Sequence, residues 1–291
     1  MKKLFLKIKA YLTMLRPEIA IMDLTLPAVC SVLATYTTSS STPQLLPFLL
    51  AIIGSYCATV ASYVANDVID IDIDTINLPD RPLPSGKISR KEAVIYSLFL
   101  YLISLVIFYR LNFYAFLTLV IAIITITLYS GYLKRKTPFS FIPVGIAYGL
   151  VPIMVWLVFV KLTISAILFG LMICITDWGF TLSGVSRDVK GDSQKGAPTL
   201  PVSYGIKITS KFVSICWLIG IALSIVIYYT ANLGYIYLIT SILSGIWLLY
   251  KCVNFIKSPQ PEVGGNLFLQ SAKYRSILFL ALIIDICIKL I

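Results

Sequence analysis

The sequence predicts an all-α membrane protein, and three observations lead to this fold class. First, 58% of the 291 residues are hydrophobic and only 13% are charged, which gives a mean hydropathy of +0.91. Second, the apolar residues form runs of about 20 residues, the length of helix that crosses a hydrocarbon core of about 30 Å. Third, Lys and Arg gather in alternate loops between these runs, as the positive-inside rule requires.

The apolar runs divide into nine expected transmembrane helices in a single domain, residues 1–291. The first run contains Pro17 and Pro27, so it is either kinked or begins in the membrane interface. The predicted spans are 12–38, 45–65, 91–109, 113–133, 141–160, 163–182, 209–229, 234–256 and 275–291.

The distribution of basic residues predicts the orientation of the chain. The N-terminal tail and four alternate loops carry 21 of the 24 Lys and Arg residues, while Arg110, Lys161 and Lys289 lie on the other side. We therefore expect a multi-pass protein of the cell membrane with a cytosolic N-terminus and an external C-terminus. The first span lacks a convincing cleavage site, so it is expected to remain as an anchor.

Composition also excludes several function classes. The net charge of +11 does not indicate a nucleic-acid partner, because the basic residues alternate by loop and form no single patch. The chain has no histidine, which excludes imidazole metal ligands and histidine bases. Its six cysteines are scattered without a CxxC pair, so they are expected to be small buried apolar residues.

The first acidic stretch, residues 66–86, follows the second predicted span and reads NDVIDIDIDTINLPDRPLPSG. A continuous helix would place Asn66, Asp70 and Asp74 on one face, with Asp67 at its edge. Carboxylates gathered in this way repel each other unless a cation lies among them. Magnesium is the expected cation, because it is usually held by one or two carboxylates together with substrate phosphates. The alternative is a solvated acidic loop.

Several basic residues on the same predicted side could bind an anion. Prolines and a glycine stiffen the segment that carries Arg81 and Lys87, which favours a lid over an anionic substrate. Arg81 has the planar fork that matches phosphate oxygens, although it could simply balance the aspartates. Arg16 could also contact an anion or only snorkel at the interface. Tyr129 and Lys134, at the end of the fourth span, are the remaining candidates there, although most such basic clusters only set topology.

A second polar segment follows the sixth span and contains Asp188 and Asp192, which share a helical face. Arg187 and Lys195 flank them as further candidates for binding a diphosphate. Three other acids in apolar runs receive no assigned role: Asp23, Asp177 and Asp285.

The two acidic segments look like copies of each other. Asp70 and Asp74 recur 118 positions later as Asp188 and Asp192. We therefore expect two parallel repeats of four helices, residues 45–160 and 163–291, with the first span as an extra helix. Because four is an even number, both acidic ends would open on the cytosolic side, where they could converge on one diphosphate.

These motifs resemble those of the UbiA superfamily of intramembrane prenyltransferases. The segment from Asn66 to Asp74 matches the first family motif, and the pair Asp188 and Asp192 resembles the second. The resemblance implies that the nine helices form a bundle around a central cavity. It also implies two Mg²⁺ ions that bridge the diphosphate of a polyprenyl donor, and a side opening to lipid for the donor's tail. The metal ligands expected are Asn66, Asp70, Asp74, Asp188 and Asp192. Asp70, Asp188 and Arg81 are expected to be catalytic, together with Asp67, which could be either a base or a third metal ligand.

The residues of these motifs look most like those of the archaeal branch of the family, which joins a geranylgeranyl group to geranylgeranylglyceryl phosphate. The main alternative is an aromatic acceptor such as 4-hydroxybenzoate. Either reaction needs a polyprenyl diphosphate, a lipophilic acceptor and a bilayer, with no obligatory protein partner inferred. An alternative of another class is an ion-coupled transporter whose carboxylates line a cation path. A third is an inactive, enzyme-like scaffold.

Overall fold

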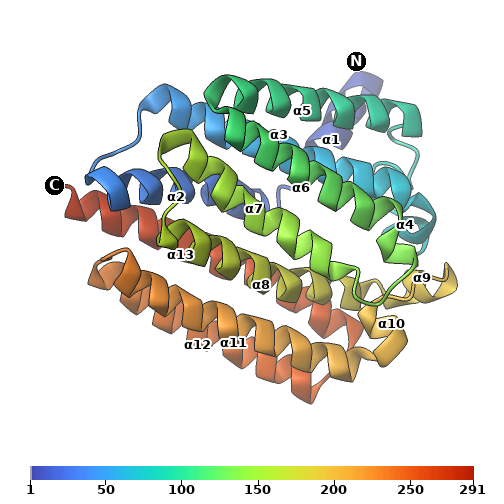
Figure 1. Ribbon diagram of the computed structural model, residues 1–291. Helices are drawn as coiled ribbons and strands as arrows, with labels where there is room; N and C mark the ends of the chain where they lie inside the picture. The colour runs from blue at the N-terminus through green and yellow to red at the C-terminus, as the bar shows by residue number, and fades with distance from the viewer. Residues whose placement is uncertain (1) are drawn as a thin grey trace.

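The computed structural model describes residues 2–291, which contain helices and no strand. A bundle of long helices makes up the body of the molecule, and short helices connect some of them (Figure 1). The helices are α1 (Lys2–Met14), α2 (Ala20–Ser39), α3 (Leu45–Ile69), α4 (Ile71–Asn77), α5 (Arg90–Leu111), α6 (Phe113–Gly131), the 3-10 turn η1 (Leu133–Arg135), α7 (Phe141–Phe159), α8 (Ile164–Arg187), α9 (Val189–Gln194), α10 (Leu200–Tyr204), α11 (Ile206–Thr230), α12 (Tyr235–Lys257) and α13 (Pro261–Lys289).

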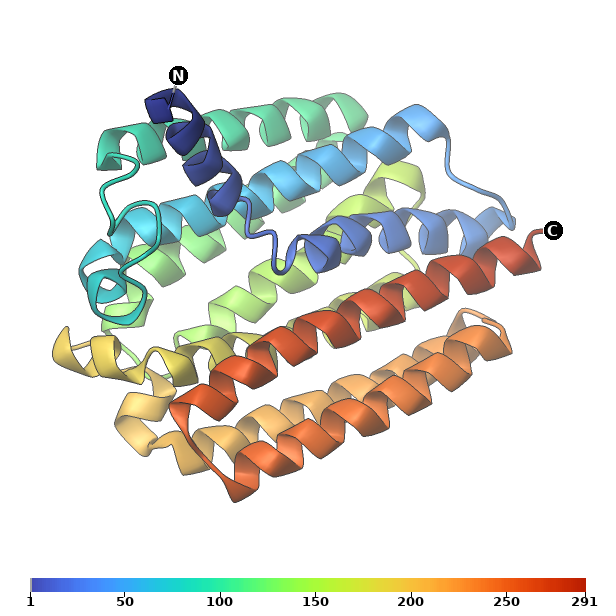
Figure 2. The same cartoon turned by 180° about the vertical axis from the view of Figure 1, so that it is seen from behind.

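The long helices pack around a central region. Helices α2, α3, α6, α7, α8 and α13 contact one another in a ring, with α5 outside α3 and α6, and α11 and α12 outside α8 and α13. Figures 1 and 2 show the short helices α4, α9 and α10 together at one end of the bundle and the C-terminus at the other. Large apolar side chains such as Leu98 and Leu243 are exposed on the outer surface, as expected for a surface that faces lipid.

Eight helices in the described part of the chain are long and apolar enough to cross a membrane: α2, α3, α5, α6 extended through η1, α7, α8, α11 and α12. Helix α13 is longer still, at 29 residues, but it is less apolar because it carries Lys273, Arg275 and Asp285. The fold is therefore the predicted all-helical membrane bundle, while the predicted number of nine spans is not confirmed.

Two predicted spans have the wrong boundaries. The predicted span 12–38 is divided, because α1 ends at Met14 and α2 begins only at Ala20. Arg16 adopts a left-handed backbone (φ 55°), and Pro17 follows it, so a continuous helix is excluded here. The predicted span 275–291 begins too late, because α13 starts at Pro261, where proline is tolerated in the first helical turn.

Arg275 and Asp285 of α13 are buried because they have partners in the bundle. The Arg275 guanidinium donates to the Asp177 carboxylate at 3.1 Å and to the Thr176 hydroxyl at 2.9 Å. Asp285 accepts hydrogen bonds from the backbone N–H groups of Gly234 and Tyr237 at the start of α12. Asp177 and Asp285 therefore stabilise the packing of α13 against α8 and α12.

The acidic stretches interrupt their helices, contrary to the continuous helix expected for residues 66–74. Helix α3 ends at Ile69, Asp70 has φ −95° and ψ 17°, and α4 begins at Ile71. Helix α8 ends in the same way, because Asp188 has φ −90° and ψ 6° and α9 begins at Val189. The repeat of residues 45–160 and 163–291 stays a prediction, and the similar breaks, 118 positions apart, support it.

Candidate active site

The two acidic segments meet at one end of the bundle, where α4 contacts α9. The Lys134 ammonium, which follows α6, lies 2.6 Å from Asp70 Oδ2 and 3.7 Å from Asp192 Oδ1. One cation therefore contacts a carboxylate from each acidic segment. The two acidic segments, which were predicted to meet, thus lie together at one end of the bundle.

Asn77 fixes the two segments to each other. Its side-chain amide donates to the Asp188 carbonyl at 2.9 Å, and its Oδ1 accepts from the Gly191 N–H at 2.9 Å. Gly191 must lack a side chain here, because a Cβ would lie 2.5 Å from Asn77 Nδ2. The last residue of α4 is thus bonded to the break before α9 and to α9 itself.

A cavity opens between α3, α6, α7, α8 and α13 at this end of the bundle, and its empty space is about 1000 Å³ when the part open to solvent is included. Nine of the residues predicted for the site line it: Arg16, Asn66, Asp70, Asp74, Arg81, Tyr129, Lys134, Arg187 and Asp188. Asp67 and Asp192 are buried beside it. Lys87 and Lys195 are exposed and do not line it. Lys87 instead donates to the Asp80 carbonyl at 3.2 Å, so the role predicted for these two lysines stays a prediction.

Arginines hold the acids of the first segment. The Arg81 guanidinium donates to Asp74 at 2.6 Å and to Asp67 at 3.1 Å. Asp67 also accepts from Arg16, so the buried Asp67 carboxylate positions two arginines at the cavity. This arrangement places planar, always-charged donors where an anionic substrate would bind.

The carboxylates differ in their surroundings. Burial raises the pKa of Asp74 to about 6, while Arg81 opposes the shift. Burial likewise raises the pKa of Asp192 to about 6, opposed by Lys134. Asp72 points away from the cavity and pairs with Arg135 at 2.7 Å, and this hydrogen-bonded ion pair lowers the pKa of Asp72. Asp72 is therefore a structural acid, whereas Asp74 and Asp192 interact readily with additional positive charge.

The residues present fit a hard divalent cation. Asp70 Oδ1 and Asp192 Oδ1 are buried and accept no hydrogen bond, so one oxygen of each segment is available for coordination. Within residues 2–291 no group of three or more acidic or thiol side chains is placed to hold a metal ion by itself, so other ligands would have to complete the coordination. Such open sites are typical of magnesium, which completes its coordination with waters and substrate phosphates.

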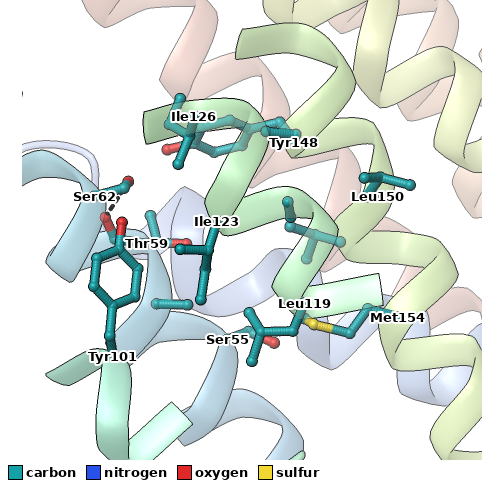
Figure 3. A pocket seen from close by; sticks show the side chains of 14 residues that line it. Ser55, Thr59, Ser62, Tyr101, Leu119, Ile123, Ile126, Tyr148, Leu150 and Met154 are labelled. Carbon is teal, nitrogen blue, oxygen red and sulfur yellow. Dashed lines mark hydrogen bonds between the residues drawn. The ribbon is translucent and has the colours of Figure 1, made fainter. Parts of the chain in front are cut away.

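A second, mostly apolar cavity adjoins the first (Figure 3), and its empty space is about 470 Å³ when the part open to the outside is included. It lies between α3, α5, α6 and α7, and small residues such as Ala58, Ala122 and Ala147 leave its space open. Ser62, Ile126 and Tyr148 line both cavities. The charged cavity and the apolar cavity therefore adjoin at these three residues.

Three polar features of the site were missed by reasoning from the sequence. Asn77 resembles an ordinary loop residue, and its contact depends on how α4 meets α9. Tyr63 and Tyr148 resemble core aromatic residues, yet their hydroxyls are joined by a hydrogen bond of 2.7 Å. The unassigned Asp23 accepts from Tyr63 at 2.9 Å. The cost of placing an acid in an apolar helix is the signal in the sequence that could have drawn attention to Asp23.

The profile of the UbiA prenyltransferase family matches residues 24–282. The chain belongs to this family. Digeranylgeranylglyceryl phosphate synthase of Methanosphaera stadtmanae is 31% identical to this UbiA-family chain over 72% of this chain and 78% of the relative. Protoheme IX farnesyltransferase 1 of Picrophilus torridus is 31% identical over 77% of this chain and 76% of the relative.

Solved structures have the same fold. A structure of digeranylgeranylglyceryl phosphate synthase has a TM-score of 0.69 at 27% identity, covering 96% of this chain and 98% of the other. A UbiA homologue from Archaeoglobus fulgidus, bound to GPP and Mg²⁺, has a TM-score of 0.66 at 20% identity, covering 95% and 99%. The family and the fold expected from the two aspartate motifs are thus confirmed.

Proposed function

We propose that this UbiA prenyltransferase transfers a geranylgeranyl group from its diphosphate to the free hydroxyl of geranylgeranylglyceryl phosphate. The observation that carries this proposal is the convergence of Asp70 and Asp192 on Lys134, beside a charged cavity that adjoins an apolar one. The relatives named digeranylgeranylglyceryl phosphate synthase support the choice of acceptor. Each substrate has a charged head and a lipid tail, which suits a site at the end of a membrane bundle.

The metal ligands in this proposal are Asn66, Asp70, Asp74, Asp188 and Asp192, which would hold two Mg²⁺ ions. When bound, the ions neutralise the charge that develops on the leaving diphosphate. The Mg²⁺ and GPP bound to the Archaeoglobus homologue support this part of the proposal.

The chain's own cations act on the same charge. Arg81 and Lys134 reach the cavity from the segments that follow α4 and α6, and both are held by buried aspartates. Arg16, Tyr129 and Arg187 line the same wall. Because these donors are positioned before the reaction, they stabilise the leaving group without reorganisation at the moment of bond cleavage.

The apolar cavity provides a place for the first part of the donor's tail. Its walls are mostly aliphatic, with Tyr101 and Tyr148 as aromatic members. Such walls exclude water from the carbon that loses the diphosphate, and aromatic faces stabilise its cationic character. No covalent nucleophile is required, in agreement with the absence of histidine from the sequence.

The proposed orientation places the charged cavity and the N-terminus on the cytosolic side and the C-terminus outside. It rests on the excess of Lys and Arg in alternate loops. The positions of α4 and α9 at one end of the bundle and of the C-terminus at the other agree with it (Figure 2).

The proposal is tested with purified protein in nanodiscs, geranylgeranyl diphosphate, Mg²⁺ and a panel of acceptors, with products identified by mass. We expect the digeranylgeranyl product from geranylgeranylglyceryl phosphate, and no product with EDTA. Asp70→Asn and Asp192→Asn should lower the rate at least about 100-fold, while Asp80→Asn, an exposed acid in the same stretch, should not. Prenylation of a different acceptor, or magnesium-dependent ion flux without any prenylated product, would refute the proposal.

A further inference from the structure

A chain of hydrogen bonds leads away from the junction of the two cavities into the bundle. The Tyr148 hydroxyl of α7 donates to the Tyr63 hydroxyl of α3 at 2.7 Å. The Tyr63 hydroxyl in turn donates to Asp23 Oδ2 of α2 at 2.9 Å. The three side chains come from three different helices, so their alignment is a property of the bundle and not of one segment.

Asp23 at the end of this chain is a buried carboxylate without a close cation. Its exposed fraction is 5%, and among the side chains of residues 5–291 no Lys or Arg nitrogen lies within 4 Å of it. Arg275 of α13, Asp177 of α8 and Glu18 face it from farther away. The Arg275 guanidinium donates to Asp177 and not to Asp23. A buried acid without an ion pair is costly, which indicates a function.

The other end of the chain lies where the reacting atoms would be. Tyr63 lines the charged cavity, and Tyr148 lines both the charged and the apolar cavity. Figure 3 shows the Tyr148 ring beside Ile126, another residue shared by the two cavities. A donor with its diphosphate in one cavity and its tail in the other has its reacting carbon at this junction.

We propose that Tyr148, Tyr63 and Asp23 form the relay that accepts the proton of the attacking hydroxyl. This inference rests on the proposed function. The acceptor oxygen bonds to the first carbon of the prenyl chain, while the bond from that carbon to the diphosphate breaks and its electron pair leaves with the diphosphate. The acceptor's proton passes to the Tyr148 oxygen, the Tyr148 proton to Tyr63, and the Tyr63 proton to the Asp23 carboxylate.

The hydrogen-bond directions suit this transfer. Tyr148 and Tyr63 already donate toward Asp23, so the Tyr148 oxygen can accept a hydrogen bond from a substrate. Two other acids near the cavities are engaged differently. Asp67 pairs with both Arg16 and Arg81, and Asp177 pairs with Arg275. Asp23 is therefore the buried acid that is connected to the junction through hydroxyl groups alone.

The relay is tested by comparing Tyr148→Phe, Tyr63→Phe and Asp23→Asn with the wild type in nanodiscs. Under single-turnover conditions with geranylgeranyl diphosphate, Mg²⁺ and geranylgeranylglyceryl phosphate, each variant should transfer the prenyl group about 100-fold more slowly, the usual contribution of a positioned base. The affinity for the donor in Mg²⁺, measured by calorimetry, should change less than about threefold, because the relay does not contact the diphosphate. Tyr237→Phe is the matched control, since it removes a hydroxyl bond from a fully buried tyrosine that lines neither cavity; its rate should equal that of the wild type.

A thiol acceptor separates proton transfer from a structural effect. A thiol ionises much more readily than an alcohol, and the cysteine thiol has a pKa of about 8.5, so in alkaline buffer a substantial fraction of a thiol acceptor is already ionised and needs no base. With a geranylgeranylglyceryl phosphate analogue that carries a thiol in place of the hydroxyl, the deficit of Tyr148→Phe should shrink to less than about tenfold. If Tyr148→Phe transfers the prenyl group to the natural acceptor at the wild-type rate, the relay is overturned. An equal loss of rate with the hydroxyl and the thiol acceptor overturns it as well. Both results leave the proposed prenyl transfer unaffected. If the wild-type protein prenylates only the aromatic carbon of 4-hydroxybenzoate, the proposed function is overturned. The relay then falls with it, because no attacking hydroxyl would lose a proton.

Discussion

Removing the Asn77 side chain should weaken donor binding without unfolding the protein. Asn77→Ala deletes two hydrogen bonds, one to the Asp188 carbonyl and one from the Gly191 N–H. Each such bond contributes about 0.5–1.5 kcal/mol net, so about 1–3 kcal/mol of the contact between α4 and α9 is lost. If the diphosphate needs both acidic segments in place, its affinity falls by about fivefold to about 150-fold.

The measurement is a calorimetric titration of geranylgeranyl thiodiphosphate, which reacts slowly, into protein with Mg²⁺. Asn254→Ala on α12 is the matched control, because the Asn254 side chain makes no hydrogen bond in the described structure and lies outside both cavities. An unchanged dissociation constant for Asn77→Ala, within about twofold, would refute the idea that this contact holds the site together.

Gly191→Ala provides a second check on the same contact. Its new Cβ would lie 2.5 Å from Asn77 Nδ2 and 2.7 Å from Asn77 Cγ, so α9 must move away from α4 and donor affinity should fall. In the Asn77→Ala background the obstructing atoms are gone, and Gly191→Ala should cost little more. The two changes should therefore be strongly non-additive in a double-mutant cycle, and strict additivity would contradict the proposed contact.

Three further predictions concern other parts of the molecule. Arg275→Met leaves the buried Asp177 carboxylate unpaired and should lower the free energy of unfolding in detergent by about 3 kcal/mol. Adding Asp177→Leu should restore most of that free energy. Equal instability of the single and double variants would contradict a stabilising ion pair. Lys134→Met removes the cation shared by the two acidic segments and should slow prenyl transfer at least about 100-fold, whereas the exposed Lys136→Met should have no effect; similar rates for both would contradict the assignment. Ala122→Phe fills part of the apolar cavity and should shift the ratio of kcat/KM values toward farnesyl over geranylgeranyl diphosphate by about tenfold, the scale of a small change in pocket size; an unchanged ratio would place the tail elsewhere.

The sequence predicted those helices whose apolar runs face lipid, because hydropathy alone is enough for them. It failed where tertiary contacts offset a local preference. Helix α13 begins at Pro261 and not near Arg275, because Arg275 finds Asp177 and Thr176 inside the bundle. The break at Arg16 and Pro17 depends on a left-handed backbone that hydropathy does not report.

The candidate site was predictable as far as its charges repeat along the chain. The recurrence of Asp70 and Asp74 as Asp188 and Asp192 pointed to a shared site, and the convergence on Lys134 follows that expectation. The pairing of Tyr148 with Tyr63 could not be predicted, because it requires the distance between α3 and α7. Roles that depend on one hydroxyl facing another become visible only after the helices are assembled.

The matched breaks at Asp70 and Asp188 have a consequence for how the site meets its ligand. Each break has nearly the same backbone angles, so each half of the chain delivers a carboxylate on the same local scaffold. Pyrophosphate is itself made of two like groups joined by an oxygen. In the proposed site, each break would bind one of the two phosphates of the donor. A substitution at one break would then weaken the binding of one phosphate and leave the other phosphate bound.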